Sequence, residues 1–407
     1  MKRDPGSSLS TRKYVKYAAL ICIVFSKNNG SQNELVDLVK EIRFMDIIEE
    51  PRKRYLELDA VRAIALLFLP IIHVYEEMEL IGTLSPEALS SCKWVLTLCV
   101  YAPSVFMLCF GTNLFFAKEK TPAEYAKRGL KFLLIGVGLN VARFVLPSLI
   151  SLAMGKPERV TEAMNNVLAS DIYDFVGLFL IVFSLFKKLR MSDFSMLITA
   201  MIMLLINTLI QPVPVEGSTA YFLGRFLYVN DNSYFPLLSW TIFPTIGYCF
   251  GKLYRNFQSE QERRKFNVRM LIFCYVMYCA LAYTFKSYNL KPNLIELSPA
   301  NSYITDYGNV MMLVCIAGMM IGFIYLAYMK WSESRPLKAL VKLSAVIMPF
   351  YLIQWVIVGW MEELMVAFDF PQGGIGTGAF YVISLGIMLV TIFLAEVFGK
   401  KINKLLK

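Results

Sequence analysis

His73 is the one histidine in this chain of 407 residues. It lies in an apolar stretch, eleven positions after Arg62. Histidine gains or loses a proton near neutral pH without help from its surroundings. Ionisable groups at membrane depth cost free energy and are usually retained for a function. If an imidazole moves a proton in this protein, the imidazole must be that of His73.

The charged residues near His73 can be placed on one helix. Eleven helical residues turn about 1100° and rise about 16 Å, so Arg62 and His73 project from the same face, about three turns apart. Asp59 precedes Arg62 by three residues and is expected to pair with it, because an unpaired buried charge is costly. Glu76 and Glu77 follow His73 by three and four residues. Either carboxylate could accept a hydrogen bond from one ring nitrogen and leave the other nitrogen as a base.

Two roles remain open for this cluster. It can perform proton chemistry, or it can be structural. In the structural case His73 is a neutral ring that bonds to a neighbouring helix, and Arg62 extends to the membrane interface. Pro70 cannot donate its backbone hydrogen bond and is expected to bend the helix just before His73.

The composition indicates which elements position these residues. Hydrophobic residues make up 57% of the chain and charged residues only 18%, which is typical of a polytopic membrane protein. Apolar runs long enough to cross a hydrocarbon core of about 30 Å recur along the chain, so we expect an all-α bundle of about ten transmembrane helices. The predicted spans lie near 57–79, 93–117, 128–153, 172–187, 194–211, 236–254, 268–286, 306–329, 338–361 and 376–399.

The net charge of +10 is a signal of topology and not of nucleic-acid binding. Lys and Arg cluster in every second connection, for example at 52–54 and 118–131, and the connections between them carry few. Basic loops of membrane proteins face the cytoplasm. Both termini are therefore predicted to be cytoplasmic, with longer external loops near 154–171, 211–235 and 287–305.

The chain divides into two predicted parts. Residues 1–50 are expected to be a cytoplasmic or interfacial extension, because their apolar run is too short to span a membrane. Residues 51–407 are expected to form the membrane domain. Met45 begins a segment that continues into the first span, so translation could start there. The eight cysteines include no CxxC pair, and neither a disulfide framework nor a metal site is expected.

Several motifs follow one another in the order found in a known superfamily. They occupy Leu58–His73 (L-D-A-V-R, then H), Tyr125–Lys131, Asp171–Leu178, Phe235–Lys252 and Tyr351–Trp355. In this order they resemble the transmembrane acyltransferase superfamily, which includes the acyltransferase-3 proteins and bacterial relatives of heparan-alpha-glucosaminide N-acetyltransferase. Ala63 stands where the usual opening motif has glycine, and a helix tolerates that exchange readily.

The resemblance implies an acyl-CoA-dependent O- or N-acyltransferase in the cytoplasmic membrane of a bacterium. Such an enzyme takes an acyl group, usually acetyl, from cytoplasmic acetyl-CoA or another acyl-CoA. It passes the group to a hydroxyl or amine of a carbohydrate-like or glycolipid acceptor at the external face. The expected partners are the lipid bilayer, acyl-CoA and this acceptor, with no metal and no nucleic acid, and a homo-oligomer is left open.

The resemblance also implies a site for the donor. Lys127, Arg128 and Lys131 form a basic cluster at the cytoplasmic mouth, where they could bind the phosphates of CoA or simply anchor the helix. Arg62, paired with Asp59, lies deeper and could contact a pyrophosphate or pantetheine oxygen.

In the same resemblance His73 meets the thioester, either as general base for the acceptor or as a nucleophile that carries the acyl group. The general base is favoured, because one histidine cannot easily be both nucleophile and proton acceptor without help from Glu76 or Glu77.

Further polar and aromatic residues are candidates for binding the acceptor, and most have a structural alternative. They are Asn140, Arg143, Asp171, Trp240 and Gln354. Arg143 could instead pair with an acidic group or extend to the interface. Asp171 could cap a helix, Trp240 could belong to an interfacial aromatic belt, and Gln354 could be core packing.

Two rival functions use the same residues differently. In a proton-coupled transporter or flippase, His73 and Arg62 would relay protons. In a non-catalytic membrane scaffold, His73 would have no task.

Overall fold

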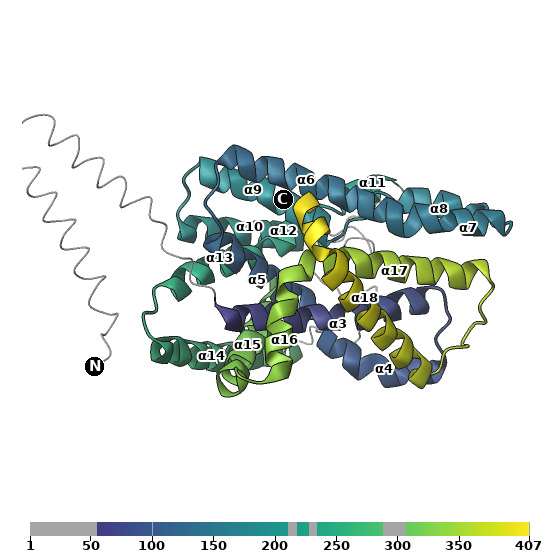
Figure 1. Ribbon diagram of the computed structural model, residues 1–407. Coiled ribbons are helices and arrows are strands. Elements are labelled where there is room, and N and C mark those ends of the chain that lie inside the picture. Colours follow the sequence, from purple (N-terminus) through teal and green to yellow (C-terminus); the bar gives the residue numbers. More distant parts are fainter. Residues whose placement is uncertain (1–54, 100, 211–217, 228–233, 288–306, 407) are drawn as a thin grey trace, which may run out of the picture. The chain divides into compact units, whose positions relative to one another are not determined.

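Helices form the protein in the computed structural model, which describes residues 55–406 except 100, 211–217, 228–233 and 288–306 (Figure 1). The predictions for residues 1–50 and for Met45 lie outside this range. Among the described residues there is no strand, only one isolated bridge between Leu84 and Ile375, and the all-α prediction is confirmed for them. The elements are α3 (Leu56–Leu80), α4 (Pro86–Cys99), α5 (Ala102–Phe116), α6 (Pro122–Asn140), the π-helix η2 (Val141–Val145), α7 (Leu146–Ala153), α8 (Glu158–Asn166), α9 (Ile172–Lys188), α10 (Asp193–Ile210), α11 (Ser218–Leu223), α12 (Leu237–Trp240), α13 (Ile242–Arg255), α14 (Glu260–Ser287), α15 (Tyr307–Trp331), α16 (Arg335–Leu343), the 3-10 helix η4 (Ser344–Val346), α17 (Ile347–Ala367) and α18 (Thr377–Leu406).

Seven helical segments in the described part are long and apolar enough to cross a membrane. They are α3, α6 to α7, α10, α14, α15, α16 to α17, and α18. Helices also occupy the other three predicted spans, but α5, α9 and α13 have only 15, 17 and 14 residues. At 1.5 Å per residue they rise about 21–26 Å, less than a hydrocarbon core of about 30 Å. The protein is thus an integral membrane protein with seven candidate spans, while the count of ten and the cytoplasmic termini stay predictions.

Prolines explain where two helices begin. Pro103 and Pro122 stand in the first turns of α5 and α6, whereas Pro147 follows η2 within the continuous helical segment Pro122–Ala153. The N–H groups in the first turn of a helix have no acceptor within the helix, so proline loses no hydrogen bond there. The fixed φ of proline also suits the helix. The predicted span at 93–117 is consequently two helices, α4 and α5. By contrast, α3 continues through Pro70 to Leu80.

The first span is the central helix of the described bundle. α3 packs against α4, α5, α15, α16, α17 and α18, and Figure 1 shows it among these helices. Most of its residues are buried, including Glu57, Asp59 and His73. Protein surrounds these polar groups, so other side chains can bond to them and offset the free-energy cost of placing them within a membrane.

Glycines let two helix pairs approach closely. A Cβ added to Gly111 of α5 would lie 1.9 Å from the carbonyl oxygen of Pro244 in α13. A Cβ added to Gly247 would lie 1.9 Å from the carbonyl oxygen of Leu108. Gly129 of α6 and Gly177 of α9 make a similar contact. These close contacts hold the short helix α5 against α13 and the short helix α9 against α6.

The helices run between two ends of the bundle. We call the end where α3 begins the basic end; it carries the connections at 117–121, 189–192 and 256–259. We call the other end, where α3 finishes, the His73 end. There the turn after α3 is joined to the segment before α18, because Gly373 N donates to Gly82 O at 3.0 Å and Ile375 N to Thr83 O at 2.9 Å.

Candidate functional site

His73 faces α17, and its ring has a defined partner there. Its Nδ1 lies 3.0 Å from Oε1 and 2.8 Å from Nε2 of Gln354. If the amide oxygen faces the ring, it accepts a hydrogen bond from Nδ1–H and leaves Nε2 as the basic nitrogen. Gln354 is thus a partner of Nδ1 because α17 packs against this face of α3, and the orienting role expected of Glu76 or Glu77 stays a prediction.

Aromatic rings complete the surroundings of His73. The imidazole stacks on Trp355, with centroids 3.9 Å apart and planes 20° apart, and meets Tyr351 edge-on at 6.1 Å. Tyr351, Gln354 and Trp355 are spaced by three and four residues and so share one face of α17. His73 and Trp355 are buried, and Gln354 is fully so. This packing restricts the imidazole to one orientation.

Arg143 extends the site from a neighbouring element. It belongs to the π-helix η2, and π turns often occur at functional sites. Its Nη1 lies 3.3 Å from Asp171 Oδ2, and its guanidinium carbon lies 4.3 Å from the ring centroid of Trp355. Of the two roles open to Arg143, the ion pair is the one present. Gly359 of α17 allows the contact, since a Cβ there would lie 2.5 Å from Arg143 O.

Asp171 and Asn140 support this region. Asp171 caps α9 in a capping box with Asp174 and accepts a hydrogen bond from the hydroxyl of Tyr351. The amide nitrogen of Asn140 donates to Val167 O at 3.0 Å and to Ala169 O at 2.9 Å, which holds the segment before Asp171. Asp171 and Asn140 thus help to hold the segments that surround Arg143.

Trp240 occupies the aromatic core. It is buried, and its ring lies 4.8 Å from Phe235, 5.0 Å from Phe243 and 6.5 Å from Phe175, measured between centroids. These contacts describe core packing more closely than an interfacial belt. Binding of an acceptor by Trp240 stays a prediction.

An ionic cluster closes the His73 end of α17. Arg159 of α8 donates through Nη2 to Glu362 at 3.0 Å and to Glu363 at 2.6 Å. Burial lowers the pKa of Arg159, but the bonds to Glu363 and the charge of Glu362 outweigh it and raise the pKa overall. Glu362 also hydrogen-bonds Glu77 of α3. Arg159, Glu362 and Glu363 were not predicted from the sequence; the paired glutamates at the end of a predicted span were the available signal.

Arg62 and Asp59 form the expected ion pair nearer the basic end. Arg62 Nε is buried and finds no hydrogen-bond partner in the part of the chain that the structure describes. Beside them, the buried carboxylate of Glu57 accepts a hydrogen bond from Tyr254 at 2.9 Å. The predicted pair is confirmed, and one nitrogen of Arg62 stays available to an acceptor.

The basic residues of α6 lie apart from that pair. Lys127 is exposed, and the guanidinium carbon of Arg128 lies 5.6 Å from the ring centroid of Phe132. α6 packs mainly on α9, whereas Arg62 belongs to α3. Among the described residues, α3 and α6 are not one of the helix pairs that pack extensively.

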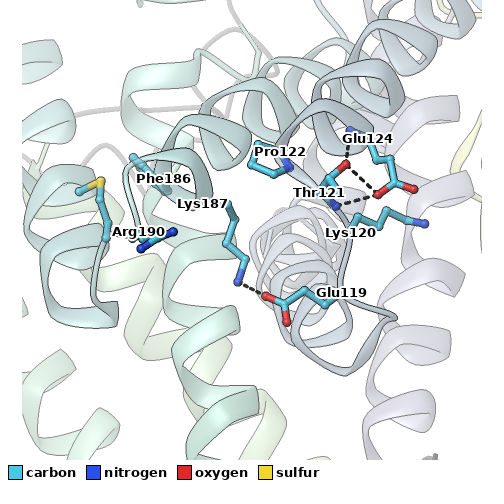
Figure 2. A pocket seen from close by; sticks show the side chains of 9 residues that line it. Glu119, Lys120, Thr121, Pro122, Glu124, Phe186, Lys187 and Arg190 are labelled. Atoms are coloured by element: carbon cyan, nitrogen blue, oxygen red, sulfur yellow. Dashed lines mark hydrogen bonds and ion pairs between the residues drawn. The ribbon is translucent and has the colours of Figure 1, made fainter. Parts of the chain in front are cut away.

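A pocket of about 480 Å³ opens at the basic end, beside the start of α6 (Figure 2). It carries three cationic side chains, those of Lys120, Lys187 and Arg190. Lys187 donates to Glu119 at 2.9 Å, and this bond lowers the pKa of Glu119. Its lining is Glu119, Lys120, Thr121, Pro122, Glu124, Phe186, Lys187, Arg190 and Met191.

Comparison with known proteins identifies the family. The model of the catalytic domain of heparan-alpha-glucosaminide N-acetyltransferase matches residues 54–278, more than half of the chain. The match includes His73, Arg62 and Arg143, and Gln354 and Trp355 lie beyond it. No curated protein and no solved structure matches the chain. Among the described residues no group of three potential ligands could hold a metal ion. The chain belongs to the heparan-alpha-glucosaminide N-acetyltransferase family, whose members are membrane acetyltransferases that use acetyl-CoA as donor.

Proposed function

We propose that this protein transfers an acetyl group from acetyl-CoA to a hydroxyl or amine of a carbohydrate-like acceptor, with His73 as general base. The observation that carries the proposal is the contact between His73 Nδ1 and Gln354 in a buried site. With one ring nitrogen held, the other is left to accept a proton. Membership of an acetyltransferase family supplies the reaction in which that proton moves.

The reaction can be written with His73 as the only base. The acceptor gives its O–H or N–H proton to Nε2 while its lone pair attacks the thioester carbonyl carbon. The tetrahedral intermediate collapses, the C–S bond breaks, and the CoA sulfur takes the proton from the imidazolium. General-base catalysis of this kind contributes about 10²–10⁴-fold to a rate.

The donor is proposed to enter at the basic end, from the cytoplasm, and the acceptor to react at the external side. Phosphates of CoA suit the cationic groups there: Lys120, Lys187 and Arg190 at the pocket in Figure 2, and Lys127, Arg128 and Lys131 on α6. Arg62 lies further along α3 with a free Nε, and a pantetheine arm could pass it toward His73.

The test is acceptor-dependent release of CoA by the purified chain in lipid nanodiscs. Labelled acetyl-CoA is supplied with a panel of amino sugars and neutral sugars, and free thiol and labelled product are measured together. Hydroxylamine then separates esters, which it cleaves, from amides, which survive. If no acceptor stimulates thiol release and acetyl-CoA does not bind, the transferase is excluded and the proton-coupled transporter is favoured.

Gln354→Leu is expected to lower kcat about tenfold, the effect of losing one hydrogen bond of about 1.4 kcal/mol, because the imidazole loses the partner that fixes its tautomer. The KM for acetyl-CoA should not change. Gln354→His can still bond Nδ1 and serves as the matched control that retains activity. Wild-type kcat in Gln354→Leu would contradict an orienting role.

Arg62→Ala is expected to weaken acetyl-CoA binding about tenfold, the loss of one charge-assisted contact to a phosphate or carbonyl oxygen. Isothermal titration with CoA and acetyl-CoA measures the effect, and Arg62→Lys retains the charge as a control. Equal affinities in Arg62→Ala and wild type would assign Arg62 to anchoring the helix.

A further inference from the structure

Two buried N–H groups beside His73 have no hydrogen-bond partner among the described residues. They are Nε1 of Trp355 and Nε of Arg143. Arg143 is only 5% exposed and Trp355 9%. A buried donor left without a partner costs about 1–3 kcal/mol, so folded proteins rarely retain one without a reason. Two such donors at one site indicate that an acceptor atom arrives there.

Neighbouring groups do not satisfy these donors. Arg143 uses Nη1 toward Asp171, which leaves Nε unpaired. The hydroxyl of Tyr351 donates to Asp171 and makes only a weak contact with the indole N–H of Trp355, which has no hydrogen bond of normal geometry among the described residues. The donors are therefore available to a group outside the protein.

Both donors lie at the Trp355 ring. One is the indole N–H of that ring, and the other belongs to the Arg143 guanidinium that packs on it. The imidazole of His73 lies 3.9 Å from the Trp355 ring, and the guanidinium carbon of Arg143 lies 4.3 Å from it. A carbonyl that reacts at His73 is therefore next to the Trp355 ring, against which the Arg143 guanidinium also packs. Asp171 pairs with the same guanidinium and reduces the cost of its buried charge.

We infer that Trp355 Nε1–H and Arg143 Nε–H stabilise the oxyanion that forms on the thioester carbonyl during acetyl transfer. The inference rests on the proposed function. As the acceptor bonds to the carbonyl carbon, the C=O π electrons move onto oxygen, and the two donors bind the negative charge. When the C=O bond forms again, the C–S electron pair leaves on sulfur, which takes the proton from His73. Donors fixed before the reaction are effective in this role, because no reorganisation is needed as charge develops.

Trp355→Phe is the sharpest test, since it retains an aromatic ring against His73 and Arg143 and removes the N–H; it also removes part of the ring area, for which Trp360→Phe controls. Loss of one oxyanion donor typically lowers kcat by about 10²–10³-fold, and we expect about 10²-fold here. Affinity for acetyl-CoA, measured by titration, should stay within about twofold, because the ground-state carbonyl carries little charge. The dependence of kcat on pH should keep its shape, because the base His73 is intact.

Trp360→Phe is the matched control. Trp360 lies on the same helix, and its indole N–H is satisfied by Ala142 O at 3.0 Å. It should keep wild-type kcat. Arg143→Lys retains the positive charge without an Nε donor, and it is expected to lose kcat, like Trp355→Phe, at unchanged acetyl-CoA affinity.

The outcomes separate this inference from the proposed function. If wild type does not transfer acetyl groups, the proposed function fails. If wild type is active but Trp355→Phe matches it and Trp360→Phe, the oxyanion role is overturned while the function stands. A Trp355→Phe variant that loses affinity for acetyl-CoA at unchanged kcat also overturns the role, because the N–H would then stabilise the bound ground state and not the oxyanion.

Discussion

Replacing His73 with glutamine or alanine should lower kcat for acetyl transfer by about 10²–10⁴-fold, the usual contribution of a general base. No other imidazole is present in the chain to take its place. Affinity for acetyl-CoA should change little, because the base acts on the acceptor proton and not on donor binding. Steady-state rates of CoA release, with donor affinity from titration, measure both quantities.

Glutamine is the more informative of the two replacements, because its amide can still contact Gln354 and limits the cavity that alanine leaves. Thermal unfolding in detergent shows whether each variant retains its fold. Wild-type turnover in a folded His73→Gln variant would mean that His73 is structural. Acid quenching without acceptor separates the mechanisms: a nucleophilic His73 yields labelled protein and one CoA, and a general base yields neither.

Arg159→Met should be the most destabilising of the surface-accessible changes, by about 2–3 kcal/mol, since removing one partner of a buried ion pair leaves uncompensated charge. Its partners Glu362 and Glu363 have side chains only 7% and 6% exposed. α17 would then carry two unpaired carboxylates at the end that follows Gln354 and Trp355. A fall in the midpoint of thermal unfolding measures the effect.

Two controls distinguish the ion pair from simple loss of a side chain. Adding Glu362→Gln and Glu363→Gln to Arg159→Met should restore much of the stability, because the uncompensated charges are removed. Lys156→Met should have a smaller effect, since its carboxylate partner Asp369 is 85% exposed and such pairs contribute about 0–1 kcal/mol. Equal destabilisation by Arg159→Met and Lys156→Met would contradict the buried pair.

Spacing along one helix predicted part of the site. Arg62 and Asp59 are three residues apart, and they pair because helical geometry places such residues together. The partner of His73 was not predictable in this way, since Gln354 is 281 positions away and reaches the ring only when α17 packs on α3. Glu76 and Glu77 were favoured because sequence distance was the only distance available.

Other features needed the packing as well. Arg159 lies on α8, in a predicted loop, and its partners are more than 200 positions away. The pairing of Arg143 with Asp171 was one of two roles that the sequence left open. Span counting identified all seven candidate spans of the described part, but α5 and α13 are shorter than their apolar runs at 93–117 and 236–254, because prolines and loop residues begin them late.

The most direct test uses sealed proteoliposomes that contain acetyl-CoA labelled separately in the acetyl group and in the adenine, with the acceptor outside. Protease added outside the vesicles digests the molecules whose basic end faces outward. Only molecules whose basic end faces inward then contribute to the signal. An acetyltransferase with His73 as base should place acetyl label on the acceptor while adenine label stays inside, and His73→Gln should abolish the first signal. Passage of adenine label together with acetyl label, or unchanged acetyl transfer by His73→Gln, would contradict it.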